Sequence, residues 1–328
     1  MKSIKAAVAQ ITCVDGMIEH NLLRATEMVA EAKKNGADMV LFPEFMSQGY
    51  RLTEEIWDSA EPWDGPTVSW LRETSQRNNI FIGTSFLEAK DGQFLNTFAM
   101  TDPSGTIAGI VRKRYPSMWE AYFFRGWDGD HVFNTEIGRI GVGICFDNHT
   151  YKVASAISAG NPDLVLMPHS YCTPTLPGKL VSADDIERLR NRPVEVAQLY
   201  NSFLGVPVVL VNKSGKWDSP VPNRMFGSPE NFAFSGRSTV IDSDGTIKCS
   251  LADGETIGYG IISLMQQPGK NHAIPRHSRY IYPGPAGREL IRLIELQGFL
   301  SYSLNKRRQA VAKKIVQKFE NNNSSNKF

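Results

Sequence analysis

Apolar positions along the chain follow two periods, and the period predicts which segments form strands and which form helices. Short runs rich in β-branched residues indicate buried strands, whereas apolar positions spaced by three and four indicate helices that bury one face. The predicted strands are residues 4–11, 37–44, 80–87, 139–145, 162–168, 206–211 and 257–264. Hairpins are predicted over 96–113 and 238–250, because each of these segments contains a turn that begins at an aspartate and ends at a glycine.

The predicted helices are residues 20–35, 66–77 and 182–204, with another directly after residue 145. Pro66 suits the first turn of its helix, and we expect Pro193 to interrupt the longest one. In the first helix we expect the inward face to consist of Leu22, Leu23, Met28, Val29 and Ala32.

The mixture of strands and helices predicts a layered α/β domain. Neither an internal repeat nor a linker divides residues 1–270, which we expect to form one domain. Residues 271–328 are predicted to form an arm and a helical extension, because 268–285 is rich in Pro, Gly and His. In this extension 288–304 is amphipathic and 306–319 is basic. We expect the chain from Asn321 onward to be disordered.

Cys145 lies where the run 139–145 changes from apolar to polar. A thiol at a turn between a strand and a helix faces a cleft, and nearby helix amides favour its thiolate. The alternative is structural, because free cysteines are often simply buried.

Two other ionisable residues also follow apolar strands. Glu44 ends the run 37–44, and Lys113 ends a second predicted strand, 109–113. Enzymes built on sheets collect their chemistry beyond the ends of strands. A single ionisable residue at the end of a strand is commonly just exposed to solvent. Three of them in the order Glu, Lys, Cys indicate an active site.

At these residues the sequence resembles the carbon–nitrogen hydrolase family, also called the nitrilase superfamily. The matching segments are residues 41–44 around the glutamate, 112–113 around the lysine, 141–147 around the cysteine, and the opening strand 4–11. The resemblance extends from about residue 4 to about residue 265. It implies a four-layer αββα sandwich, here with a C-terminal helical extension.

The resemblance also implies roles for these residues. Cys145 would attack an amide or nitrile carbon as the nucleophile, after Glu44 has taken its proton. Lys113 and the backbone N–H of Phe146 would stabilise the negative charge that develops on oxygen or nitrogen. Water would then hydrolyse the thioester.

A second glutamate often lies between the lysine and the cysteine in this family, and Glu120 matches it. It would position the substrate or assist as an acid or base. The alternative for Glu120 is a solvated glutamate in a surface loop.

Several aromatic and histidine side chains adjoin these motifs and are candidates for binding substrate: Tyr50, Trp119, His149, His169 and Tyr171. Each could equally pack in the core or at its rim. The arginines at 188, 190 and 192 could bind a substrate carboxylate, or they could be exposed on their helix.

Composition excludes several other classes of protein. The 328 residues are 41% hydrophobic and carry a formal net charge of +2, without the basic footprint of a nucleic-acid-binding protein. The cysteines at 13, 145, 172 and 249 have no paired spacing, and no metal-ligand or cofactor motif is present, so we expect no metal and no cofactor. No membrane segment or signal segment is expected, which predicts a cytoplasmic protein.

The substrate class remains open between alternatives. Asp147 follows the amidase and carbamoylase pattern, which favours a small amide or N-carbamoyl compound, whereas the spacing of Lys113 and Glu120 is closer to that of nitrilases. A third alternative is a non-catalytic binding protein with the same fold, against which the intact set of Glu44, Lys113 and Cys145 argues. By resemblance, we expect a homodimer or a higher homo-oligomer.

Overall fold

The computed structural model describes residues 3–178, 181–222, 231–264, 273–284 and 288–325. Two six-stranded sheets lie face to face in these residues. The first has the order β15-β1-β2-β3-β4-β5. Its strands are β1 (Ser3–Gln10), β2 (Met39–Leu41), β3 (Phe81–Lys90), β4 (Gln93–Thr101), β5 (Ile107–Arg112) and β15 (Thr256–Ser263).

The second sheet has the order β14-β13-β10-β8-β7-β6. Its strands are β6 (Val132–Thr135), β7 (Gly138–Val142), β8 (Leu164–His169), β10 (Val208–Asn212), β13 (Thr239–Ile241) and β14 (Ile247–Ser250). A small third sheet combines β9 (Cys172–Pro174), β11 (Lys216–Trp217) and β12 (Phe232–Phe234).

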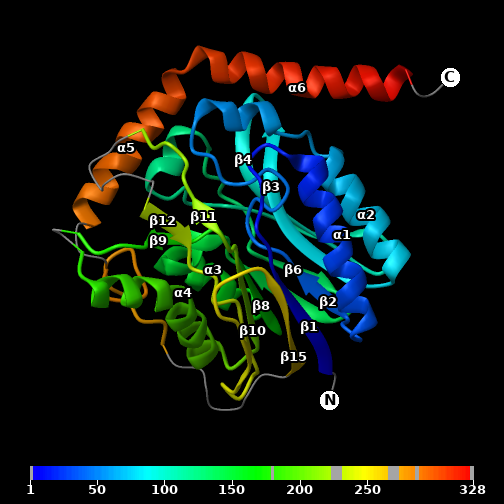
Figure 1. The fold of residues 1–328 in the computed structure, drawn as a ribbon, viewed down its shortest axis with the longest axis vertical. Coiled ribbons are helices and arrows are strands. Elements are labelled where there is room, and N and C mark those ends of the chain that lie inside the picture. The colour runs from blue at the N-terminus through cyan, green and yellow to red at the C-terminus, as the bar shows by residue number, and fades with distance from the viewer. Residues whose placement is uncertain (1–2, 179–180, 223–230, 265–272, 285–287, 326–328) are drawn as a thin grey trace.

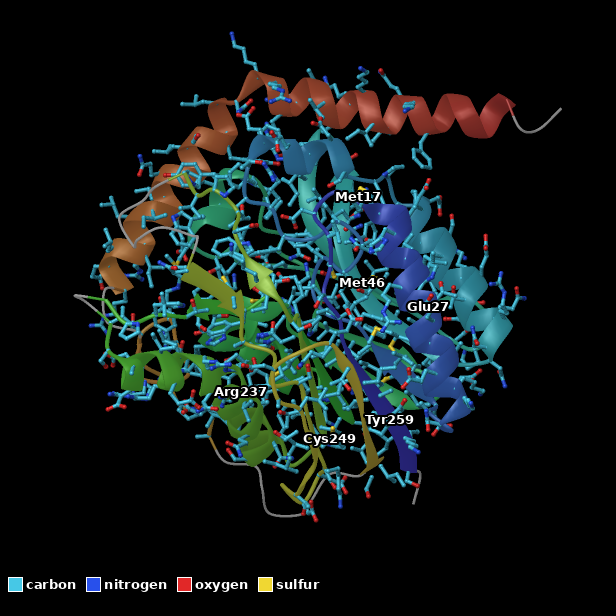
Figure 2. All side chains as sticks on the ribbon, viewed as in Figure 1. Met17, Glu27, Met46, Arg237, Cys249 and Tyr259 are labelled. Atoms are coloured by element: carbon cyan, nitrogen blue, oxygen red, sulfur yellow. The ribbon has the colours of Figure 1, made fainter. Side chains whose placement is uncertain are left out.

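Helices cover the outer face of each large sheet, which completes the predicted four-layer αββα sandwich (Figure 1). The first sheet is covered by α1 (Ile18–Lys34) and α2 (Pro66–Asn78), and the second by α3 (Tyr151–Ala159) and α4 (Ala183–Leu204). Figure 2 shows side chains filling the space between the layers, with the buried Met46 beside α1.

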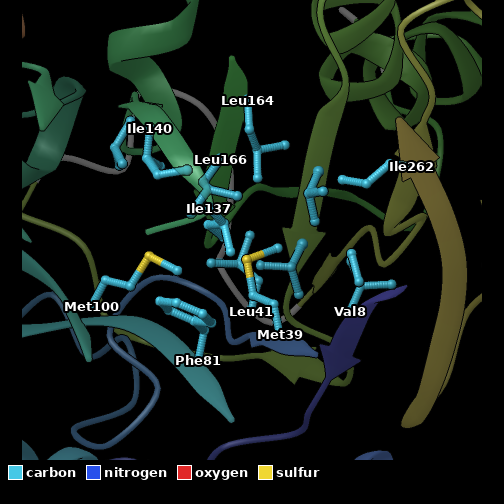
Figure 3. Close-up of a cluster of buried hydrophobic side chains, with 14 of the residues drawn as sticks. Val8, Met39, Leu41, Phe81, Met100, Ile137, Ile140, Leu164, Leu166 and Ile262 are labelled. Atoms are coloured by element: carbon cyan, nitrogen blue, oxygen red, sulfur yellow. The ribbon is translucent and has the colours of Figure 1, made fainter. Parts of the chain in front are cut away.

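Each central strand is apolar throughout because both of its faces are buried. In β8, Leu164 and Leu166 enter the core between the sheets, while Val165 and Met167 pack against α3 and α4. Figure 3 shows the core between the sheets, to which the second sheet contributes Leu166 and the first sheet contributes Leu41. Parallel strands buried on both faces produce such continuous apolar runs.

The strand register brings the predicted site residues to one edge. β1, β2 and β3 are parallel, as are β7, β8 and β10. Because their carboxyl ends point the same way within each sheet, the segments that follow β2, β7 and β8 emerge at that edge. β5 also runs in the direction of β3, since both are antiparallel to β4.

Three sequence predictions about these elements were wrong. Leu23 does not face inward but is 65% exposed, because it lies one position past the buried stripe of α1. Pro193 does not interrupt α4, which is continuous from Ala183 to Leu204. The strand predicted over 37–44 is assigned only at Met39–Leu41, so Glu44 lies beyond the ladder.

The C-terminal extension packs on the same chain. α5 (Arg288–Leu304) lies on the short 3-10 helix η2 (Met118–Tyr122), and α6 (Lys306–Ser325) lies beside β3, β4 and the 3-10 helix η1 (Glu54–Ser59) (Figure 1). α6 is helical as far as Ser325, beyond Asn321, where we expected disorder to begin. Of the predicted arm over 268–285, residues 268–272 and 285 lie outside the described residues.

Candidate active site

Cys145 lies at the sharp turn between β7 and α3, as the first residue of the 3-10 helix η3 (Cys145–His149). Its φ of 48° lies in the left-handed region, which residues other than glycine rarely occupy. The turn is closed by Asn148, whose Nδ2 donates to the Gly143 carbonyl at 2.7 Å. A Cβ at Gly143 would lie 2.0 Å from Asn148 Oδ1, so the turn requires glycine at this position. Strain of this kind is characteristic of functional positions.

Asp147 joins this turn to the segment that carries the lysine. Its carboxylate accepts the backbone N–H groups of Arg114 at 3.0 Å and Tyr115 at 2.9 Å. The residue directly before them is Lys113. The cysteine turn and the lysine segment are therefore held together by backbone contacts that do not depend on long side chains.

Glu44 is fully buried three residues after β2, and both of its carboxylate oxygens are hydrogen-bonded. Oε1 accepts from Asn96 Nδ2 at 2.7 Å and from Lys113 Nζ at 2.8 Å. Oε2 accepts from the backbone N–H of Ser170 at 2.8 Å. The Ser170 hydroxyl also donates to the Glu44 carbonyl at 2.8 Å. These bonds fix the orientation of the carboxylate.

Lys113 lies between two carboxylates. Its Nζ is 2.8 Å from Glu44 Oε1 and 2.7 Å from Glu120 Oε2, and all three side chains are buried. Burial alone would lower the pKa of Lys113, but the negative charges of Glu120 and Glu44 raise it well above the ordinary value. The lysine is therefore a stable cation.

Glu120 lies on η2 and is fully buried, which excludes the alternative of a solvated loop glutamate. It completes a capping box in which the Ser117 backbone N–H donates to Oε2 at 2.6 Å. The Tyr50 hydroxyl donates to Oε1 at 2.7 Å. Burial raises the pKa of Glu120, and Lys113 opposes that shift.

The Cys145 thiol is protonated at rest. Burial and the nearby Glu44 carboxylate raise its pKa well above the ordinary value, while Lys113 and the backbone N–H of Ser170 act in the opposite direction. The sequence suggested that nearby helix amides favour the thiolate, but burial has the larger effect on this group. A reacting thiol here needs a base to accept its proton.

Two histidines lie next to the cysteine turn, and both are neutral. The ring of His149 stacks at 6.0 Å on those of Phe146 and Tyr171, and its Nδ1 is 2.9 Å from the Tyr282 hydroxyl. Burial, followed by the positive charge of Arg192, lowers the pKa of His149 to about 3. Burial also lowers the pKa of His169, whose Nε2 is 3.1 Å from Asn148 Nδ2.

The remaining candidates, Tyr50 and Trp119, belong to an aromatic cluster next to Glu120. Tyr50 and Trp119 both approach the Trp217 ring, at 6.0 and 6.2 Å between centroids. Tyr50 also approaches Phe234, which belongs to the small third sheet. All the predicted site residues thus belong to one region, although His149, His169 and Tyr171 form a separate cluster within it.

The three arginines of α4 do not converge on a common point. Arg188 pairs with Asp185, Arg190 with Asp253 and Arg192 with Glu195. Of the three, Arg192 approaches the histidine cluster, with its guanidinium 4.7 Å from the centre of the Tyr282 ring.

Lys213 was missed in the sequence. It is buried one residue after β10, and its Nζ donates to the Phe45 carbonyl at 3.0 Å. The signal that marked Glu44 and Lys113, a charge directly after an apolar strand, was present here too. Ser170 and Asn96 were also missed, and their residue types carry no comparable signal.

Within the described residues, no group of three or more His, Cys, Asp or Glu side chains is arranged to hold a metal ion. None of the helices in the described part of the chain has the length and apolar content needed to cross a bilayer.

Comparison with known proteins identifies the family. The profile of the family described as carbon-nitrogen hydrolase matches residues 5–266. The chain belongs to this family. The match covers nearly all of both sheets and every residue of the buried network, so the chain is a carbon–nitrogen hydrolase, as predicted.

Its relatives include both amidases and nitrilases. The chain is 27% identical over 262 residues to the N-carbamoylputrescine amidase of Solanum lycopersicum, covering 77% of this chain and 83% of that one. It is 30% identical over 164 residues to a nitrilase of Pyrococcus abyssi, which covers 48% of this chain and 62% of the nitrilase. The crystal structure of a carbon-nitrogen hydrolase from Helicobacter pylori G27 matches its fold with a TM-score of 0.71 at 19% identity, covering 80% of this chain and 90% of that one.

Proposed function

We propose that this carbon–nitrogen hydrolase cleaves a small amide or N-carbamoyl compound through a thioester on Cys145. The observation that carries the proposal is the buried network in which Lys113 bridges Glu44 and Glu120 beside the strained cysteine turn. Three buried charges in one site are costly to the fold. Their common position beside a protonated thiol supports a catalytic role.

In the first half of the reaction, Glu44 takes the proton from the Cys145 thiol as the sulfur attacks the carbonyl carbon. The carbonyl oxygen becomes an oxyanion, which Lys113 and the backbone N–H of Phe146 stabilise. Glu44 then returns the proton to the leaving nitrogen, the carbon–nitrogen bond breaks, and ammonia or an amine departs. The acyl group remains on sulfur as a thioester.

In the second half, Glu44 takes a proton from a water molecule, which attacks the thioester carbon. The carbon–sulfur bond breaks, the proton passes to the thiolate, and the acid leaves. One water molecule is consumed for each carbon–nitrogen bond cleaved. Glu120 acts in both halves by holding the Lys113 ammonium in place, and Tyr50 holds Glu120 in turn.

The surroundings of the network favour an uncharged reacting group, because His149 and His169 beside the cysteine turn are both neutral. The similarity to the N-carbamoylputrescine amidase of Solanum lycopersicum supports the amide or N-carbamoyl class of substrate. The four free cysteines suit a reducing compartment such as the cytoplasm.

A nitrilase activity is the second candidate, favoured by the nitrilase relative and by the spacing of Lys113 and Glu120. The test is ammonia release from a panel of amides, N-carbamoyl compounds and nitriles. Wild type is compared with Cys145→Ala, and Cys172→Ala serves as the control because Cys172 is a second cysteine near the site. Release from amides or carbamoyl compounds that is lost only in Cys145→Ala supports the proposal.

Release from nitriles alone would replace the amide proposal with the second candidate. Full activity of Cys145→Ala would overturn the mechanism. A folded wild type that is silent on the whole panel would favour the non-catalytic alternative. Mass spectrometry of the acid-quenched reaction should also find the acyl group on the peptide that contains Cys145.

A further inference from the structure

A cavity of about 860 Å³ lies between the domain and its C-terminal extension. One wall comes from η2, from the loops on either side of it and from the start of α3. The other wall comes from residues 276–279 and from α5. The Tyr151 backbone N–H donates to the Arg279 carbonyl at 2.8 Å, which joins the two walls. The family profile ends at residue 266, so the second wall is built from residues outside the matched region.

Cationic side chains dominate the lining of this cavity. It contains six cations and two carboxylates, an excess of four positive charges, whereas the whole chain has a formal net charge of only +2. A concave surface lined by one sign of charge concentrates small ions of the opposite sign. The six cations are Arg114, Arg125, Lys152, Arg276, Arg279 and Arg292.

The two carboxylates, Asp128 and Glu295, neutralise only part of this charge. Asp128 pairs with Arg114, and its other oxygen lies 3.5 Å from Lys152 Nζ. Glu295 accepts from two nitrogens of Arg279, at 2.7 and 3.4 Å. The Arg114 side chain is only 10% exposed, and its buried Nε has no hydrogen-bond partner in the described residues. The lining therefore keeps hydrogen-bond donors that the protein itself does not satisfy.

Two arginines of the lining, Arg125 and Arg276, have no carboxylate partner in the described part of the chain. The Arg125 guanidinium lies 4.5 Å from the centre of the Phe299 ring. The Arg276 guanidinium lies 4.7 Å from the centre of the Tyr151 ring. An aromatic face holds a guanidinium in place while its N–H groups remain free to donate to an acid.

Aromatic side chains supply the apolar part of the lining: Tyr115, Phe124, Trp127, Tyr151 and Phe299. We propose that the cavity binds a small organic anion that has a planar apolar part and two negative charges. Its carboxylate or phosphate groups accept hydrogen bonds from Arg125 and Arg276, the two cations that have no carboxylate partner. The start of α3 strengthens the attraction, because its first two residues line the cavity and the N-terminal end of a helix carries partial positive charge.

The cavity lies beside segments that carry the buried network. Tyr115 is two residues after Lys113, and Ala121 directly follows Glu120. The same anion chemistry therefore has two sources, the acidic end of a substrate and a free acid that regulates the enzyme. Only the first source rests on the proposed function, whereas binding itself does not.

The first experiment measures binding to the full chain by isothermal titration calorimetry. The probe is isophthalate, a planar dicarboxylate, and its uncharged counterpart is 1,3-benzenedimethanol. The test variant is Arg125→Gln/Arg276→Gln, and the matched control is Arg188→Gln, which changes an arginine on α4 that is 69% exposed and outside the lining. Circular dichroism of each variant confirms that it is folded.

We expect saturable binding of isophthalate to wild type and no binding of the diol. The Kd for isophthalate should rise at least about tenfold in the double variant, because hydrogen bonds from charged groups to the acid are lost. It should stay unchanged in Arg188→Gln. This result is obtained whether or not the enzyme hydrolyses the amide panel, so a failure of the proposed function does not decide it.

The second experiment separates the two sources of the anion. Ammonia release from a substrate of wild type is measured at increasing isophthalate. A rise in KM at constant kcat assigns the cavity to the acidic end of the substrate, and a change in kcat at constant KM assigns it to a regulatory acid. Either effect should weaken in Arg125→Gln/Arg276→Gln and persist in Arg188→Gln.

The proposal would be overturned by wild type that does not bind isophthalate saturably at millimolar concentration. It would also be overturned by a folded double variant that keeps the Kd of wild type. Equal binding of isophthalate and the diol, or an equal loss of binding in Arg188→Gln, would contradict recognition of the acid by these arginines.

Discussion

The Lys213 ammonium donates a 3.0 Å hydrogen bond to the carbonyl oxygen of Phe45, the residue that follows Glu44. Phe45 has a φ of 49°, in the left-handed region, so this carbonyl belongs to a strained segment. Lys213 also lies over the rings of Tyr50 and Phe234, at 5.8 and 5.5 Å. A buried cation thus supports the backbone next to the proposed base.

Lys213→Met is expected to lower activity without lowering stability. Burial lowers the pKa of Lys213. At any pH below the pKa of this lysine in the unfolded chain, its buried charge therefore lowers the free energy of unfolding, and an apolar side chain removes that cost. The Phe45 carbonyl still accepts the Gly49 N–H at 3.0 Å. We expect unchanged or higher stability and about a tenfold fall in kcat, the value of one hydrogen bond from a charged group.

The control for this change is Lys216→Met, at an exposed lysine three residues further along. It should keep both kcat and stability. A Lys213→Met enzyme with full kcat would show that the lysine serves only the fold.

Glu120→Gln is expected to reduce kcat about a hundredfold, because misplacing a catalytic group costs that order of rate. The negative charge of Glu120 helps to raise the pKa of Lys113, so its removal lets the lysine lose its proton at a lower pH. The alkaline limb of the pH–rate profile should therefore move to lower pH. Tyr50→Phe, which removes a hydrogen bond but no charge, should leave that limb in place. An unshifted limb in Glu120→Gln would contradict the proposed role.

Glu61 is expected to make stability fall as pH rises from about 4.5 to about 7. Burial raises its pKa from 4.5 to about 7, against the hydrogen bonds from Thr67 and Gln48. Between these pH values the folded state keeps a proton that the unfolded state has lost. The free energy of unfolding is therefore lower by about 3 kcal/mol above pH 7 than at low pH. Urea unfolding of wild type and Glu61→Gln across this range measures the effect. The difference in unfolding free energy should grow with pH in favour of the variant, and a constant difference would refute the assignment.

Gly143→Ala is expected to displace the cysteine turn. The new Cβ would lie 2.0 Å from Asn148 Oδ1, in a side chain that is fully buried and bonded to the Gly143 carbonyl. Overpacking of this kind costs about 1–3 kcal/mol of stability, and kcat should fall with it. Gly178→Ala, where nothing lies within 4 Å of the added Cβ, is the control. Equal behaviour of the two variants would contradict the packing argument.

The sequence by itself predicted a layered α/β domain and showed which ionisable residues follow its strands. Continuous apolar runs mark strands buried on both faces, and the turns at 102–105 and 242–245 mark hairpins, because both signals are local. Glu44, Lys113 and Cys145 could be grouped because each follows a strand, and the ends of neighbouring strands meet at one edge. The resemblance to a family then supplied the sandwich and the chemistry.

Only the tertiary structure decided how each group is surrounded. Whether Glu120 is solvated or buried, whether Cys145 rests as a thiol and whether His149 is neutral all depend on burial by residues distant in the chain. The contact between Lys213 and Phe45 joins residues 168 positions apart, and no local pattern encodes it. The same holds for the arginine-lined cavity, whose cations come from segments as distant in the chain as Arg114 and Arg292. Local spacing determines secondary structure, whereas charge states and cavities follow from which distant segments pack together.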